Sequence, residues 1–392
     1  MLQAINNGGM KTMASLEVSH LELGKLLKQF RAKGIPLFVS GATGVGKSET
    51  ILNDSKVYAT EIGREWVDYK SISSEQKRAL LNPVELSKYH LFIDIRTALL
   101  EPTDLMGIPF AEGDFVSWKP NLMMKLLSME EISATAFFDE FNLGSRMVQN
   151  SAYQIVLDKA IGELKFGRDV FIVSAGNRVE DGANIIEMAM PLKNRFAHLT
   201  LSVPTNDEFV KWLLNTQYPD TRICSLLKFA PELVFNFKPN LKEDAFATPR
   251  SIYKLAQLTH DLDEQTQLPL IRSLANAVCG SPFAMKYEGF LKLTRKVDVD
   301  EILNNPKKVR ELKEIDLKYA LVSGVASKMR GKWNDLGEKC FAVCDELEEE
   351  YAVFLLKMVK EIVGQASFSN RCLKSDLWNN KLSTKIADLF GA

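Results

Sequence analysis

A glycine-rich segment between a short apolar run and a helix start carries the clearest chemistry in the sequence. It follows the pattern G-x-x-x-x-G-K-[ST], and its residues are Gly41, Ala42, Thr43, Gly44, Val45, Gly46, Lys47 and Ser48. The glycines let backbone N–H groups converge on one anion, and the N-terminus of the following helix adds partial positive charge. In this pattern the lysine reaches the β- and γ-phosphates and the serine hydroxyl binds Mg²⁺. A Gly-rich turn without a ligand is the alternative, and the strand–loop–helix context disfavours it.

Two further apolar runs end in polar groups that suit phosphate hydrolysis. Thr135–Phe138 is followed by Asp139 and Glu140, and Val170–Gly176 is followed by Asn177. In such a site the first carboxylate holds Mg²⁺ and the second polarises the attacking water. An amide can orient that water because it donates and accepts hydrogen bonds without titrating. Taken alone, the carboxylates also fit the start of a loop, and the asparagine also fits a loop cap.

Two arginines are candidates for contacts with phosphate oxygens. Arg195 lies in the segment Pro191–Phe196, and Arg250 follows Thr248 and Pro249 at a predicted helix start. A guanidinium presents a rigid fork that fits phosphate and stays charged, as an arginine finger supplied by a neighbouring subunit must. Taken alone, the first also fits a surface arginine and the second an ordinary residue at a helix start.

Apolar runs separated by helical segments must position these groups. Five runs have the length and composition of buried strands: Pro36–Ser40, Leu91–Ile95, Thr135–Glu140, Val170–Asn177 and His198–Val203. This alternation predicts an α/β fold, with a parallel sheet covered by helices on both faces. Ligands bind such sheets at the carboxyl ends of the strands. The glycine-rich loop, the carboxylate pair and Asn177 all follow strands, so we expect them at one edge.

The rest of the chain is predicted to be mostly helical. Apolar spacing indicates a helix over 21–30, an all-helical region over 205–325 and a final helix near Leu336 to Val363. Residues 1–20 are predicted to form an N-terminal tail. The segment 53–90 is charge-rich and gives no clear assignment.

The composition of the chain limits the kinds of partner and site that we expect. The 392 residues carry a formal net charge of −1, so no bulk positive field attracts nucleic acid or an anionic membrane. The five cysteines have no C-x-x-C spacing, and Cys340 and Cys344 on one apolar stripe predict buried thiols. Four scattered histidines disfavour a structural metal site. No apolar run approaches bilayer-spanning length, so we expect a cytoplasmic protein with no membrane partner.

The motifs together resemble those of AAA+ ATPases, and more narrowly the MoxR-like branch. The stretch Pro102–Pro109 is similar to the branch's P-x-D-L-x-G-x-P sequence, and the resemblance covers about residues 25–325. The matching motifs, in chain order, are Gly41–Ser48, Asp139–Asn142, Ser174–Asn177, Asn194–Phe196 and Thr248–Arg250. Thr43 and Leu143 depart from residues common in the branch, proline and arginine, and neither departure removes a catalytic group.

The resemblance implies an αβα nucleotide-binding domain over 21–203 and a helical lid over 204–325, and it leaves a C-terminal helical extension, 326–392, unexplained. It further implies a hexameric ring in which Arg195 of one subunit reaches ATP held by the next. An insert near 108–120 and a hairpin near 159–168 would face the pore. Their aromatic residues are pore candidates, although packing explains such residues equally well: Phe110, Phe115, Trp118 and Phe166.

Three classes of function are compatible with these features. The leading hypothesis is Mg²⁺-dependent ATP hydrolysis that remodels a protein client, with a von Willebrand factor A domain protein as a separate partner. A motor that translocates or loads nucleic acid is the second, and the near-neutral charge argues weakly against it. A scaffold whose assembly is controlled by nucleotide is the third. No residue identifies the base, so GTP stays open beside ATP.

Overall fold

The computed structural model describes residues 16–178, 181, 185–237 and 244–384, so most of the predicted N-terminal tail lies outside the described residues. The chain forms two compact units that divide between Val203 and Pro204. The first is an α/β unit built on a parallel sheet, and the second is helical. The predicted fold class is confirmed.

The first unit contains a seven-stranded sheet in the order β1-β11-β2-β10-β7-β4-β3, and every strand pair in it is parallel. The sheet begins at Glu17, inside the segment predicted to be a tail. Its strands are β1 (Glu17–Val18), β2 (Leu37–Gly41), β3 (Glu65–Asp68), β4 (Tyr89–Arg96), β7 (Ser133–Asp139), β10 (Asp169–Gly176) and β11 (Ala197–Leu201).

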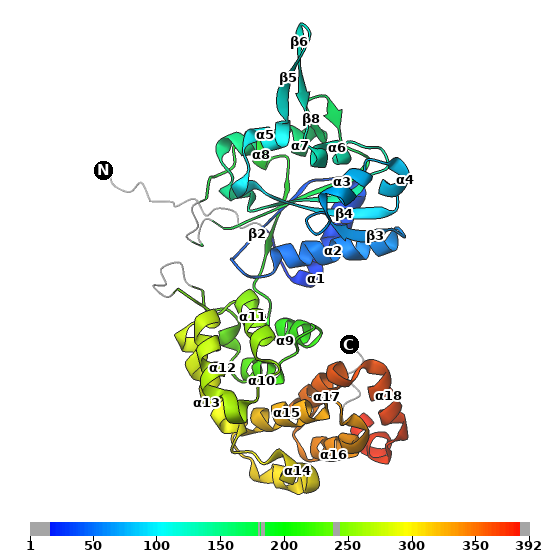
Figure 1. Ribbon diagram of the computed structural model, residues 1–392. Helices are drawn as coiled ribbons and strands as arrows, with labels where there is room; N and C mark the ends of the chain where they lie inside the picture. The colour runs from blue at the N-terminus through cyan, green and yellow to red at the C-terminus, as the bar shows by residue number, and fades with distance from the viewer. Residues whose placement is uncertain (1–15, 179–180, 182–184, 238–243, 385–392) are drawn as a thin grey trace, which may run out of the picture. The chain divides into compact units, whose positions relative to one another are not determined.

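Helices cover both faces of this sheet (Figure 1). In β7 the alternate residues Ala134, Ala136 and Phe138 join a core that also contains residues of α6 and α7. On the other face, Arg31 of α1 donates a hydrogen bond to the Thr135 hydroxyl, and α2 also packs against β7. The helices of the unit are α1 (His20–Lys33), α2 (Lys47–Glu61), α3 (Ser74–Ala79), α4 (Pro83–Leu86), α5 (Pro102–Met106), α6 (Leu122–Leu127), α7 (Arg146–Asp158) and α8 (Met190–Lys193).

Two antiparallel hairpins stand outside the main sheet. The larger joins β5 (Ile108–Glu112) to β6 (Phe115–Lys119) between α5 and α6, where the insert was predicted. It projects from the unit in Figure 1, and Phe110, Phe115 and Trp118 on it are exposed. The smaller pairs β8 (Ala160–Ile161) with β9 (Leu164–Lys165). Phe166 beside it is only 8% exposed and packs in the core. For this aromatic residue the structure thus agrees with a packing role, which was the alternative to a place in the pore.

A buried ion pair joins α1 to α2 beneath the sheet. The Arg31 guanidinium is 2.5 Å from the Asp54 carboxylate, and both side chains are 4% exposed. The guanidinium also lies 4.4 Å from the centre of the Tyr58 ring and 4.6 Å from that of Phe171. Burial raises the pKa of the Asp54 carboxyl, and the Arg31 charge opposes that shift. Through its two terminal nitrogens Arg31 thus links α1 to Asp54 of α2 and to Thr135 of β7 on one face of the sheet.

The second unit is built from helices around one apolar core that includes residues from Phe209 to Leu382. Residue 325, the predicted end of the lid, lies inside α15, so a division at that point stays a prediction. The helices are α9 (Asn206–Leu214), α10 (Thr221–Phe229), α11 (Pro249–Thr259), α12 (Glu264–Cys279), α13 (Ser281–Thr294), α14 (Val299–Asn304), α15 (Ile315–Met329), α16 (Trp333–Glu346), α17 (Glu349–Val363) and α18 (Gln365–Lys374).

The predicted single helix from Leu336 to Val363 is wrong. The chain breaks at Leu347 and Glu348, whose backbones are extended, so α16 and α17 are separate helices. A continuous helix of this length would span about 40 Å, longer than a compact core of this size. The break instead folds α17 back onto the bundle and buries Leu347, which is 2% exposed. Apolar spacing is similar on both sides of the break, which is why periodicity missed it.

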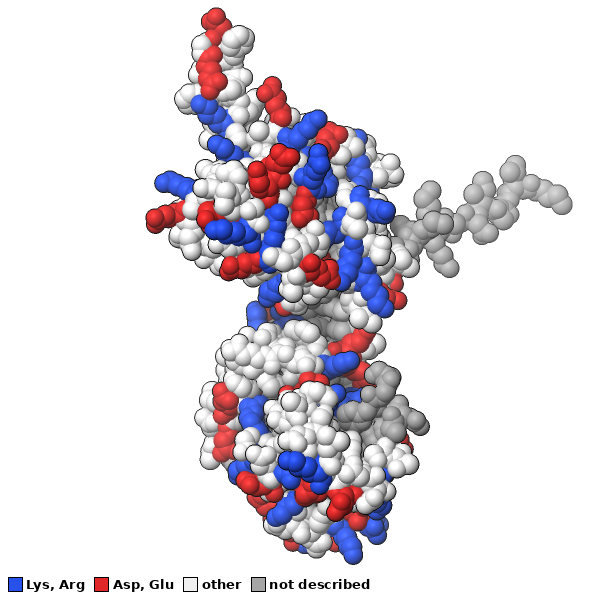
Figure 2. Space-filling view, turned by 90° about the vertical axis from the view of Figure 1, so that its right-hand side faces the viewer, with Lys and Arg blue, Asp and Glu red and all other residues white. Residues whose placement is uncertain are grey.

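All five cysteines are free and buried, as predicted for Cys340 and Cys344. Among the described residues no helix is long and apolar enough to span a membrane. Figure 2 shows basic and acidic side chains interspersed on the viewed face of each unit.

The buried His90 generates a prediction about acid stability. Its ring contacts the Ser133 hydroxyl at 2.7 Å and the Thr135 hydroxyl at 3.0 Å. Burial, with the nearby Arg31 and Arg64 charges, lowers the pKa of His90 to about 3. The native ring is therefore neutral at pH 5, whereas the unfolded ring takes up a proton below about pH 6.5. The preference of the native state for a neutral ring therefore stabilises the fold fully above about pH 6.5, and this contribution is lost as the pH falls toward 3.

We expect this linkage to cost the wild-type protein about 2 kcal/mol of unfolding free energy between pH 7 and pH 5. His90→Gln keeps polar contacts but cannot titrate, so its loss should be smaller by that amount. Urea unfolding of both proteins at the two pH values measures the difference. Parallel losses in the two proteins would contradict the prediction.

Candidate functional site

The glycine-rich loop lies between β2 and α2, at the carboxyl edge of the sheet. Gly44 and Gly46 have φ values of 78° and 104°, in the left-handed region that favours glycine. Lys47 is the first residue of α2, and the first N–H groups of a helix have no acceptor within the helix. The loop therefore has the backbone form of an anion-binding nest at a helix N-terminus.

The Lys47 ammonium is buried, with 9% of the residue exposed. It donates to the carbonyl oxygens of Gly41, at 2.7 Å, and Ala42, at 3.0 Å. It also donates to the side-chain oxygen of Asn177 at 3.3 Å. One cation thus links the loop to the end of β10, and carbonyl dipoles stabilise its charge in the buried position.

Ser48 and Asp139 meet at the same edge. The Ser48 hydroxyl donates to Asp139 Oδ2 at 3.0 Å, although the two residues are far apart in the sequence. Hydroxyl and carboxylate oxygens are ligands that Mg²⁺ prefers, and Mg²⁺ usually completes its shell with water and substrate phosphate. The pair fits that role. Among the described residues no cluster of three or more His, Cys, Asp and Glu could hold a metal without such a substrate.

Glu140 adopts an unusual backbone conformation directly after β7. Its φ of 53° and ψ of 36° lie in the left-handed region, which costs a non-glycine residue of order 1 kcal/mol. Its N–H donates to Asp139 Oδ1 at 2.9 Å, and the Thr97 hydroxyl donates to the Asp139 carbonyl at 2.9 Å. These two hydrogen bonds stabilise the turn that follows β7.

Asn142 fixes the position of Asn177, and its role was not predicted from the sequence. Its side-chain amide donates to the Asn177 carbonyl at 2.7 Å and accepts from the Asn177 N–H at 3.2 Å. A Cβ at Gly176 would lie only 2.5 Å from the Asn142 side-chain oxygen, so glycine is required for this approach. The two ends of β7 and β10 are therefore joined by a reciprocal pair of hydrogen bonds. In the sequence, the only sign of this role was the position of Asn142 three residues after Asp139.

The two predicted arginines are not joined to this cluster. The Arg195 guanidinium lies 3.7 Å from the centre of the Tyr153 ring of α7. Its Nη1 is buried and has no hydrogen-bond partner among the described residues. Arg250, exposed and second in α11, belongs to the other unit. The structure thus brings together Lys47, Ser48, Asp139 and Asn177 beside Glu140, and the roles of both arginines stay predictions.

No protein-family model and no curated protein matches the chain. Among solved structures, a point variant of RuvB from Thermotoga maritima is 14% identical and has a TM-score of 0.34, and the match covers 79% of this chain and 83% of that one. PCH-2 from C. elegans is 12% identical over 70% of this chain and 66% of its own, with a TM-score of 0.30. NtrX from Brucella abortus is 13% identical over 84% and 68%, with a TM-score of 0.35.

These identities and scores are too low to transfer any function, so the functional assignment depends on this chain's own residues. The fold is an α/β unit with a glycine-rich phosphate-loop motif, followed by a helical region. Its polar cluster lies at the edge where parallel sheets bind ligands.

Asn142 gives the site its first test. Asn142→Ala should lower the unfolding free energy by about 1–3 kcal/mol, because it removes two hydrogen bonds to the half-buried Asn177 backbone. Urea unfolding measures the loss. Asn53→Ala is the control, since the Asn53 amide bonds to Glu49 on the exposed face of α2 and its loss should cost under about 0.5 kcal/mol. Equal stability of the two variants would contradict the structural role of Asn142.

Proposed function

We propose that the chain is a Mg²⁺-dependent ATPase of the AAA+ class, belonging to its MoxR-like branch, that remodels a protein client. One observation supports the nucleotide chemistry most strongly. Two hydrogen bonds form at one edge of the sheet, from the Lys47 ammonium to the Asn177 amide oxygen and from the Ser48 hydroxyl to the Asp139 carboxylate. Glu140 lies next to them, at the end of β7.

In the proposed reaction, backbone N–H groups of the loop and the Lys47 ammonium bind the phosphates of ATP. The ammonium exchanges the Gly41 and Ala42 carbonyls for phosphate oxygens. Ser48 and Asp139 would hold Mg²⁺, which neutralises phosphate charge when it is bound. Because Lys47 and Asn177 are already in contact, the γ-phosphate end of the nucleotide would lie beside the Asn177 amide.

Hydrolysis then requires one water and one base. The water oxygen attacks the γ-phosphorus while the bond from that phosphorus to the β–γ bridging oxygen breaks, which releases ADP and inorganic phosphate. The Glu140 carboxylate accepts a proton from the water, and the Asn177 amide orients it. Arg195 of a neighbouring subunit and Arg250 of the helical unit stabilise charge on the phosphates.

We further propose that the chain forms a hexameric ring, acts on a protein client and works with a separate partner protein. These proposals follow from the resemblance of five ordered motifs to the MoxR-like branch, which also implies a separate von Willebrand factor A domain partner. In a hexameric ring the arginine of one subunit completes the site of the next. The mixed charge on the viewed faces agrees with a protein client better than with a polyanion (Figure 2).

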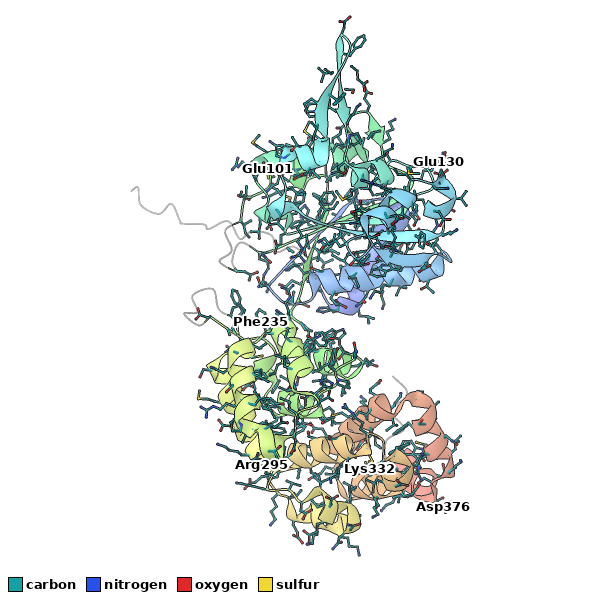
Figure 3. All side chains as sticks on the ribbon, in the orientation of Figure 1. Glu101, Glu130, Phe235, Arg295, Lys332 and Asp376 are labelled. Atoms are coloured by element: carbon teal, nitrogen blue, oxygen red, sulfur yellow. The ribbon has the colours of Figure 1, made fainter. Side chains whose placement is uncertain are left out.

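Glu140→Gln tests the proposed base. The variant should bind ATP as the wild type does but release inorganic phosphate at least about 100-fold more slowly, since an amide cannot accept the proton. Phosphate release in the presence of Mg²⁺ measures it. The control is Glu130→Gln, because Glu130 is exposed and precedes β7 at its opposite end (Figure 3). Undiminished hydrolysis by Glu140→Gln would remove Glu140 from the mechanism.

Tyr153 tests the role of Arg195. An aromatic ring attracts a guanidinium above its face, so Tyr153→Leu should lower kcat by about three- to tenfold with little change in the KM for ATP. Tyr153→Phe keeps the ring and should retain wild-type turnover. Steady-state ATPase kinetics at a protein concentration that saturates assembly measures both variants. Equal losses in the two variants would show that the ring face does not position Arg195.

A further inference from the structure

His20 contacts the glycine-rich loop from a distant part of the sequence. Its Nε2 lies 2.8 Å from the carbonyl oxygen of Val45, in the middle of the loop. A carbonyl oxygen can only accept a hydrogen bond, so Nε2 carries the proton and donates. The other ring nitrogen, Nδ1, is buried and has no hydrogen-bond partner among the described residues. The Val45 carbonyl is therefore the group that orients this ring.

The sheet register explains why His20 is there. Val18 at the end of β1 is level with Leu201 of β11, and Leu201 is level with Gly41 at the start of the loop. The chain thus leaves β1 at the same edge as the loop leaves β2. Ser19 then caps α1 through a reciprocal pair of bonds with Glu22, which fixes the first residue of the helix, His20.

The bond fixes the orientation of the Val45–Gly46 peptide, whose second residue is a glycine. In a trans peptide the C=O and N–H point in opposite directions, so the Val45 carbonyl and the Gly46 N–H face opposite sides. With the carbonyl bonded to His20, the Gly46 N–H points away from His20. A flip of this peptide changes ψ of Val45 and φ of Gly46, and Gly46, at a φ of 104°, gives little resistance because glycine has no Cβ.

A flipped peptide would harm phosphate binding. It would turn the Val45 carbonyl oxygen toward the position of the anion and remove one N–H from the nest. The ring also packs closely against the loop, because a Cβ at Gly46 would lie 3.2 Å from His20 Nε2. Both the close packing and the hydrogen bond of the His20 ring therefore restrain the Val45–Gly46 peptide.

We propose that His20 is a positioning residue for phosphate, which holds the Val45–Gly46 peptide in the orientation that binds the anion. This rests on the proposed function of the loop. His20 acts on phosphate affinity whatever base the nucleotide carries. It has no proton-transfer role in hydrolysis.

Calorimetric titration of the full chain with ADP, GDP and inorganic pyrophosphate tests this role. His20→Leu removes the donor, and His20→Asn keeps an amide too short to reach the Val45 oxygen. Both should weaken all three probes by the same factor, about five- to tenfold, which is the loss of one such hydrogen bond. His20→Gln places an N–H near the Nε2 position and should bind within about twofold of the wild type.

Two controls separate the possible failures. His198→Leu removes a similar bond, from His198 Nε2 to the Lys193 carbonyl at 2.7 Å, at the other end of the sheet, and should leave ADP binding unchanged. Lys47→Ala should abolish binding. Thermal unfolding of each variant reports whether it is folded.

Wild-type affinity in both His20→Leu and His20→Asn, with Lys47→Ala inactive in binding, overturns the His20 inference alone. A loss confined to ADP overturns it as well, because the residue would then contact the base. If the wild type binds none of the probes, the proposed function of the loop fails and the role of His20 fails with it.

Discussion

The position of β10 between β2 and β7 is the constraint on which the site depends. Parallel pairing of these three strands brings the glycine-rich loop, Asn177 and the Asp139–Glu140 pair to one edge in that order. The Lys47 ammonium then reaches Asn177, and Ser48 reaches Asp139. Without β10, no strand would pair with both β2 and β7 and fix the position of the loop relative to the carboxylates.

Hydrogen bonds to backbone groups support this edge of the sheet. Asn142 and Asn177 exchange two hydrogen bonds, and His20 bonds to the Val45 carbonyl. Such contacts hold backbone groups in place, and a site that binds phosphate through N–H groups depends on backbone position more than on side-chain length. Glu140, the proposed base, has a left-handed backbone, so a strained residue lies at the site of the proposed reaction.

Local patterns were enough to predict the α/β class, the main strands and the residues that cluster at the edge. Apolar runs of strand length are explicit in the sequence, and three of them are followed directly by the glycine-rich loop, the Asp139–Glu140 pair or Asn177. The contacts of His20, Asn142 and Tyr153 could not be predicted in this way, because each depends on strand register or helix packing between distant segments. The break at Leu347 escaped because one apolar spacing continues through it, and the short strand at Glu17 has too few residues to give a pattern.

The central claim is that the loop around Lys47 binds the phosphates of a nucleoside triphosphate beside Asp139 and Asn177. An experimental structure of the full chain with Mg²⁺ and a non-hydrolysable ATP analogue tests it most directly. The claim predicts that the Lys47 ammonium has left the Gly41 and Ala42 carbonyls for phosphate oxygens, with Mg²⁺ on the Ser48 hydroxyl. An analogue bound with its phosphates away from Lys47 and Asp139 would contradict it.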